Sequence, residues 1–143
     1  MKNYKKEMHV ALMCILGIAT SCKPDDEETV CQTAKDFAET YYNLDIQKAR
    51  HYCTKELESV MNFRHSSTTE KEKSMKEQVG SARIRIIDCD LNEKKSEASV
   101  RIEVSNFLRK NYLTDQVSLV ASDTFELTLI KQIDGVWRIN KPF

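Results

Sequence analysis

The sequence has very little glycine and proline, and neither sign of charge is in excess. Its 143 residues include only three glycines and two prolines, which leaves little room for flexible linkers. A chain of this length is one domain by default. Lysine and arginine together number 22, as do aspartate and glutamate, so the net charge is zero. Because no basic excess attracts nucleic acid, we predict no nucleic-acid partner.

Motifs that hold metals or phosphate are also missing from the sequence. It contains no C-x-x-C, no H-x-x-x-H and no glycine-rich phosphate loop. His51 and Cys53 stand two positions apart on a predicted helix, so their side chains point apart. We therefore predict no metal and no cofactor, and we assign no catalytic residue.

One short apolar run is present, at the N-terminus. Lys2, Lys5 and Lys6 precede an almost unbroken apolar stretch over residues 8–19, and small residues follow it. About a dozen apolar residues are too few to span a bilayer core, which needs roughly 20. The pattern is that of a secretory signal peptide, and a buried N-terminal helix is the alternative.

The end of this run, Ala19-Thr20-Ser21-Cys22, resembles the lipobox of bacterial lipoproteins. The resemblance implies cleavage before Cys22 and attachment of several acyl chains, palmitate among them, to that cysteine. Several chains anchor a protein stably, whereas one chain binds a membrane only marginally. We therefore expect the membrane to be a partner through Cys22. Ordinary secretion with cleavage nearby is the alternative.

The next residues, "KPDDEE" at 23–28, resemble the acidic export signal of surface lipoproteins in Bacteroidetes-type bacteria. The alternative is a solvated tether that places negative charge before a helix N-terminus, where the helix dipole favours it. We expect an extracytoplasmic protein anchored at the outer membrane, and exposed on the cell surface if the export signal is functional. We divide the chain into a signal peptide (1–21), a lipidated acidic tether (22–29) and a single domain (30–143).

The first half of the domain shows helical periodicity. Apolar residues recur at helical spacing over 29–43, and a second helix is expected to follow Asp45 as its N-cap and to run to about residue 61, with a break near Thr54. A third helix is expected over 70–79, because Thr69 and Glu72 have the spacing of a capping box. Since that helix has only two apolar residues, we predict a weakly held surface helix.

The second half alternates with a period of two. Residues 83–91 change phase at Ile87, which predicts a bulge, and 97–107 alternate cleanly. Residues 116–131 carry an apolar face that includes positions 117, 119, 121, 125, 127 and 129 and is interrupted by Asp123. A three-residue loop at 133–135 would pair Leu129 with Ile139, and would bring Trp137 onto the apolar face. We therefore predict an α+β fold, with N-terminal helices packed on a four-stranded antiparallel meander.

This order of elements resembles the cystatin-like, nuclear-transport-factor-2-like cone, in particular small lipoproteins of unknown function in gut-type Bacteroidetes. The segments that carry the resemblance are "TAKDFAETYYNLDIQKARHYCTKEL" (33–57) and "IDGVWRINKPF" (133–143). The small hairpin that larger members have between the helices is absent here, so the cone is expected to be shallow. The resemblance implies either a ligand pocket in the cone or an enzyme with an Asp or His base.

The candidate pocket combines aromatic residues with one carboxylate: Phe37, Tyr41, Asp123, Phe125 and Trp137. We predict a binding or interaction module whose partner is a small hydrophobic or glycan-derived ligand, or an envelope protein. The alternatives are an isomerase or dehydratase that uses Asp123, and a purely structural accessory. A buried Asp123 would have a raised pKa and could act as a base, unless a bulge or the sheet rim turns it outward.

Three cysteines remain in the domain after cleavage and lipidation, namely Cys31, Cys53 and Cys89. The expected compartment is oxidising, so a disulfide can form there. The sequence leaves open whether all three are free thiols or whether any two of them pair.

Overall fold

The structure, a computed structural model, describes residues 24–142. The predicted signal peptide and the lipid attachment at Cys22 therefore lie outside the described residues. Among the described residues, no helix is long and apolar enough to cross a membrane.

Helix α1 (Asp26–Tyr42) begins three residues earlier than predicted. The Asp25 carboxylate caps it by accepting a hydrogen bond of 2.7 Å from the backbone N–H of Glu28. The acidic residues 26–28 form its first turn, where the helix dipole favours negative charge. This part of the predicted tether is therefore helical.

The second predicted helix is divided into three pieces: α2 (Ile46–Arg50), the 3-10 helix η1 (Lys55–Leu57) and α3 (Glu58–Ser66). Asp45 caps α2 as predicted, and the break falls near Thr54 as predicted. At the break, the backbone N–H of Thr54 donates to the carbonyl of Ile139, so this segment pairs with the last strand.

Helix α4 (Glu70–Val79) begins with the predicted capping box of Thr69 and Glu72. It ends at Gly80, whose φ of 79° lies in the region that favours glycine.

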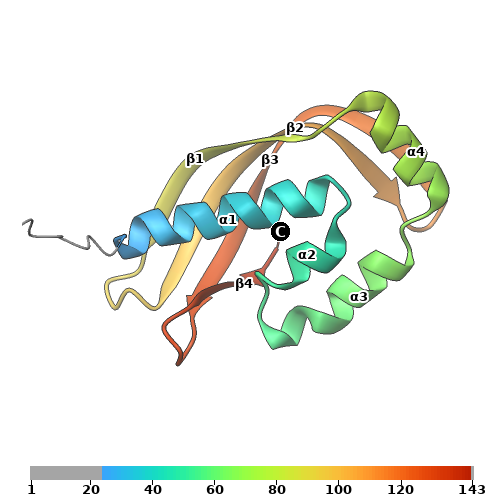
Figure 1. The fold of residues 1–143 in the computed structure, drawn as a ribbon. Coiled ribbons are helices and arrows are strands. Elements are labelled where there is room, and N and C mark those ends of the chain that lie inside the picture. The colour runs from blue at the N-terminus through green and yellow to red at the C-terminus, as the bar shows by residue number, and fades with distance from the viewer. Residues whose placement is uncertain (1–23, 143) are drawn as a thin grey trace, which may run out of the picture.

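The four strands are β1 (Arg83–Leu91), β2 (Glu97–Asn111), β3 (Gln116–Lys131) and β4 (Trp137–Lys141). They form one antiparallel sheet in the order β1-β2-β3-β4, which confirms the predicted meander and the α+β class. Figure 1 shows α1 lying along one face of the sheet, with α2, α3 and α4 continuing around its end.

Two predicted details of strand register are confirmed. The register of β1 against β2 shifts between Ile86 and Asp88, where a bulge at Ile87 was expected. Leu129 pairs with Ile139, so Trp137 lies on the buried face as the three-residue loop requires.

The core lies between α1 and the sheet. One face of α1 is fully buried against the inward residues of β2 and β3. Each buried Val, Leu, Ile or Phe side chain among them stabilises the fold by about 1.5–3 kcal/mol, and each alanine by less. These residues are Val30, Ala34, Phe37, Ala38, Val100, Ile102, Val104, Leu127 and Leu129.

The sheet changes direction at Asn106, which has a φ of 59°. Its side-chain amide donates to the carbonyls of Val79 and Ser81, so it ties β2 to the chain after α4. Beyond this point the hairpin of β2 and β3 curls toward α4 (Figure 1). On β3, Leu119 is therefore half exposed and Val120 packs on the core instead. The prediction that positions 119 and 121 share the inward face of the later residues was wrong.

Candidate functional site

A cavity of about 180 Å³ opens to solvent at the C-terminal end of α1. It lies between the end of α1, helix α3 and the curled part of β2. Its ten lining residues are Tyr41, Tyr42, Leu44, Arg64, Phe107, Leu108, Arg109, Lys110, Tyr112 and Phe125.

The inner wall of the cavity is made of aromatic rings that pack on one another. Tyr42 meets Phe107 edge to face with ring centroids 5.2 Å apart, and Phe107 meets Phe125 in the same way at 5.6 Å. Tyr41 stacks on Phe37 at 5.5 Å. Burial raises the pKa of Tyr41 to about 12, so its phenol stays protonated at neutral pH. Interlocked rings give this wall a fixed shape.

A second aromatic pair stands at the edge of the cavity. Tyr112 is 50% exposed and Phe63 is 58% exposed, and their rings lie 5.6 Å apart. The Lys110 ammonium lies 5.8 Å from the centre of the Tyr112 ring. The two rings are inclined by 45°, so each offers its own exposed face on which another ring can stack.

The charged residues that line the cavity are all cations. Arg64, Arg109 and Lys110 are among the ten lining residues, and no aspartate or glutamate is. Their carboxylate partners stand outside the lining. Arg109 pairs with Asp123 across β2 and β3, whereas the other two cations share a buried carboxylate.

That buried carboxylate is Glu72 of α4, which is fully inaccessible to solvent. Arg64 lies 2.9 Å from Glu72 Oε1 and Lys110 lies 3.4 Å from Glu72 Oε2. Oε2 also accepts the backbone N–H of Thr69 at 3.2 Å, which completes the capping box. The prediction that α4 is weakly held was based on its apolar residues alone and did not include these buried ion pairs, which connect the helix to α3 and β2.

Lys110 is held by two further polar contacts of its own. Its ammonium donates to the carbonyl of Ser67 at 2.6 Å and lies 3.0 Å from the Asp115 carboxylate. The hydrogen bond to Asp115 and the charge of Glu72 raise the pKa of Lys110, so it is cationic at neutral pH.

The structure brings together only some of the predicted pocket residues. Tyr41 and Phe125 line the cavity, and Phe37 is buried directly behind Tyr41. Trp137 lies elsewhere, because its indole N–H donates to the Asp26 carboxylate at 3.0 Å, at the N-terminal end of α1. Helix α1 has 17 residues and so separates Trp137 from the cavity by about 25 Å.

Asp123 is exposed and sits beside the cavity rather than inside it. The Arg109 guanidinium and the backbone N–H of Thr124 both donate to it, and they lower its pKa. The condition for a base at Asp123, burial with a raised pKa, is therefore not met, and the alternative that the side chain is turned outward is confirmed. The isomerase or dehydratase alternative therefore has no raised-pKa base at Asp123.

The predicted pocket contained only two of the ten lining residues. Four of the eight that it missed follow residue 107, where the second strand was expected to end. The segment "FLRKNY" at 107–112 continues β2 to Asn111, places Tyr112 in the turn that follows, and interleaves aromatic with basic residues. That interleaving was the available signal for Arg109, Lys110 and Tyr112. Arg64 carried no comparable local signal.

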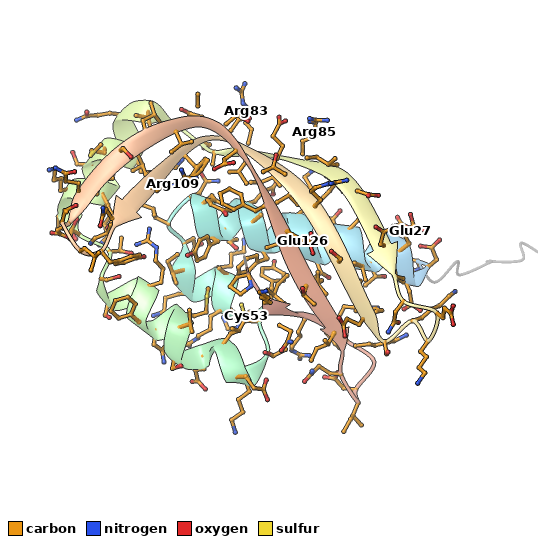
Figure 2. All side chains as sticks on the ribbon, turned by 180° about the vertical axis from the view of Figure 1, so that it is seen from behind. Glu27, Cys53, Arg83, Arg85, Arg109 and Glu126 are labelled. Atoms are coloured by element: carbon orange, nitrogen blue, oxygen red, sulfur yellow. The ribbon has the colours of Figure 1, made fainter. Side chains whose placement is uncertain are left out.

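The outer face of the sheet carries charges that compensate one another. Figure 2 shows Arg83, Arg85 and Glu126 on the face that is turned away from α1. Arg85 pairs with Glu103 at 2.8 Å across β1 and β2. On this face the paired cations and carboxylates are exposed together, whereas the carboxylates that pair with the cavity cations stand outside the cavity lining.

Between residues 24 and 142, no three side chains of His, Cys, Asp or Glu are grouped so that they could hold a metal ion. The three cysteines in this range are free thiols. Cys53 is buried, and burial raises its pKa to about 12.

Comparisons with known proteins give no match by sequence and a weak likeness by structure. No family model matches the chain, and no curated protein matches it. Among solved structures, the intermembrane space region of the chloroplast protein ARC6 is similar with a TM-score of 0.47 and 10% sequence identity. The match covers 83% of this chain and 95% of that one.

Proposed function

We propose that the protein is a lipid-anchored extracytoplasmic binding module whose cavity holds one ring of an anionic ligand, with an acidic sugar of a glycan as the ligand class. Acylated Cys22 would hold it at the outer membrane, facing the periplasm or the cell surface. The observation that carries the proposal is the make-up of the cavity. Five of its ten lining residues are aromatic, three are cationic and none is acidic.

The size of the cavity favours a single ring. Pockets for larger small-molecule ligands usually enclose about 300–1,000 Å³, and this one encloses about 180 Å³. A larger groove of about 660 Å³ shares Arg109 and Lys110 with the cavity. It leaves room for the remainder of an oligosaccharide whose terminal ring occupies the cavity.

The charges favour a carboxylate or another anion on that ring. A guanidinium has five N–H donors in a planar fork that matches a carboxylate. One guanidinium nitrogen of Arg109 is occupied by Asp123, and the carboxylate stands outside the cavity lining. Donors on the cavity side are therefore available to an anion, and the exposed Tyr112 ring beside them can stack on its ring.

We also propose that the fold is a shallow version of the cystatin-like, nuclear-transport-factor-2-like cone. In support, the helices cover one face of a curled four-stranded meander (Figure 1). The residues that line the cavity come from the curled strands and from the helices.

The position of the anchor fits this function. Three residues separate Cys22 from Asp26, the first residue of α1. Asp26 is fixed to the sheet by Lys131 at 2.9 Å and by Trp137. The cavity is at the other end of α1, about 25 Å away. An anchored domain would therefore hold the cavity away from the lipid headgroups.

Ligand binding can be tested with two sugars that differ in a single carboxylate. We expect glucuronic acid to bind in ligand-observed NMR and glucose to bind more weakly by about tenfold or more, which corresponds to one charge-assisted hydrogen bond of about 1.5 kcal/mol or more. Arg109→Gln and Tyr112→Ala should each weaken the binding of glucuronic acid.

Arg101→Gln is the matched control, because Arg101 is also an exposed arginine of β2 that pairs with an aspartate, Asp88, of a neighbouring strand. It should leave binding unchanged. Equal binding of both sugars, or an equal loss in the Arg101→Gln variant, would contradict the proposal. If the protein binds benzoate but does not bind glucuronic acid, the proposal that the ligand is an acidic sugar is excluded.

The anchor is tested separately by the mass of the mature N-terminus. We expect a triacylated or diacylated Cys22 as the first residue, and release of the protein from membranes in a Cys22→Ala variant. An unmodified Cys22, or cleavage at another position, would contradict the anchor without affecting the cavity. Protease digestion on intact cells then distinguishes the surface from the periplasm.

A further inference from the structure

Two of the three free cysteines meet between α1 and the edge of the sheet. Cys31 lies on the second turn of α1 and Cys89 lies on β1, and both are half-buried. The Cys89 sulfur is 4.0 Å from the backbone carbonyl of Glu27. In an α-helix that carbonyl accepts the N–H of the residue four positions later, which is Cys31. The Cys89 thiol therefore lies against the turn that carries Cys31.

The bulge in β1 is what turns Cys89 toward the helix. Ile84 and Ile86 face the core before the bulge, and Cys89 and Leu91 face it afterwards. Without the register shift, the alternation of a strand would send Cys89 to the outer face. Burial, and after it the neighbouring Cys31 thiol, raise the pKa of Cys89 to about 12.

We propose that Cys31 and Cys89 are a disulfide-forming pair that joins α1 to β1 when the protein is in an oxidising compartment. The geometry excludes Cys53 as the partner of Cys89. Cys53 pairs with Ile139 beside β4, at the sheet edge opposite to β1. Three strand spacings of about 4.8 Å separate those edges, and a disulfide needs Cα atoms within about 7 Å.

The oxidant is a disulfide such as oxidised glutathione or an oxidised dithiol enzyme. One protein thiolate attacks that disulfide and releases the first glutathione thiol. The second protein cysteine then attacks the mixed disulfide and releases the second. The Sγ–Sγ bond of Cys31 and Cys89 forms, the glutathione S–S bond breaks, and two electrons pass from the protein to two reduced glutathione molecules.

The bond would close a loop of about 58 residues that contains all of α2, α3 and α4. A loop of that length restricts the unfolded chain substantially, so we expect the melting temperature to rise by about 10 °C. Because the Cys89 thiol keeps its proton at neutral pH, closure in the folded protein should be slow and should accelerate as the pH rises toward 9.

The test uses the full chain, extracted in detergent and equilibrated with oxidised glutathione, then alkylated and digested. We expect one cross-linked pair of peptides, which contain Cys31 and Cys89 and are together two hydrogens lighter than the separate peptides. Cys53 should be alkylated after denaturation. Separate alkylation of Cys31 and Cys89, or stable glutathione adducts on them, would overturn the proposal.

Variants give a second measurement. Wild type and the matched control Cys53→Ala should both melt about 10 °C higher when oxidised than when reduced. Cys31→Ala and Cys89→Ala should show no difference between the two conditions. A difference that persists in either of those two variants would also overturn the proposal.

Discussion

Replacement of Glu72 by glutamine changes one charge at the centre of the site and little else. Glu72 is fully buried and pairs with Arg64 at 2.9 Å and with Lys110 at 3.4 Å. Glutamine has the same shape and is also accepted at the third helical position of a capping box. The variant Glu72→Gln therefore leaves two nearly buried cations facing a neutral amide.

The expected loss of stability follows from what remains buried. Removing one partner of a buried ion pair costs about 3–5 kcal/mol, because the other charge stays desolvated. Lys110 retains Asp115 and Arg64 retains the hydroxyl of Thr68, which favours the lower end of that range. We expect a loss of about 3 kcal/mol in the free energy of unfolding and a fall of about 10 °C in melting temperature.

Urea unfolding followed by the fluorescence of Trp137 measures this free energy. Glu70→Gln is the matched control, since Glu70 lies in the same first turn and pairs with Lys73 at 2.7 Å, but its side chain is 88% exposed. An exposed pair of this kind contributes about 0.5 kcal/mol or less. Equal effects of the two substitutions would refute the reasoning that buried ion pairs fasten α4.

Two further predictions concern the ends of the core. Hydrogen bonds from Lys131 and then from Trp137 lower the pKa of Asp26. The stabilising contribution of the Asp26 carboxylate is therefore present above the ordinary aspartate pKa and is lost as the pH falls through the lowered pKa. An acid titration of Trp137 fluorescence should show this step in wild type but not in Asp26→Asn. Asn106→Ala should cost about 2 kcal/mol in urea unfolding, because it removes two side-chain hydrogen bonds and strains a positive φ. Asn106→Gly should recover only the part of this loss that comes from backbone strain. Full recovery of the free energy of unfolding would contradict a role for the side-chain amide.

Features that depend on a few neighbouring residues could be predicted from the sequence. The capping box of Thr69 and Glu72 and the bulge at Ile87 are both signalled within three or four positions. The pairing of Leu129 with Ile139 followed from the need to keep Trp137 on the apolar face, since a one-residue slip would expose it.

The burial of Glu72 could not be predicted in this way. Glutamate is normally exposed, and it is buried here because cations from two other elements meet it. Arg64 is eight positions before Glu72 and Lys110 is 38 positions after it, so no local pattern connects the three. A helix with few apolar residues therefore looked weakly attached when it is fastened by charge.

The placement of Asp123 depended on a bend that the alternation of β3 does not reveal. The bend originates on the neighbouring strand, where Asn106 adopts a positive φ and bonds the chain after α4. As a result Val120 packs on the core. An unbroken alternation would have placed Val120 on the outer face. Asp123 lies where the phase changes, and it is exposed for that reason.

Glu72 also links the stability of α4 to ligand binding, and the two should respond in opposite directions. The carboxylate neutralises Arg64 and Lys110 from behind the cavity, whereas an anionic ligand would approach the same cations from the open side. In Glu72→Gln the fold is weaker, but the ligand carboxylate would meet cations without their internal partner. The ligand carboxylate would then replace part of the roughly 3 kcal/mol of stabilisation that the substitution removes. If it replaces about 1.4 kcal/mol, glucuronic acid should bind the variant about tenfold more tightly than wild type. Titrations of both proteins below their melting temperatures measure this, and glucose is the uncharged control. Unchanged or weaker binding of glucuronic acid to Glu72→Gln would show that these two cations are not the groups that receive the anion.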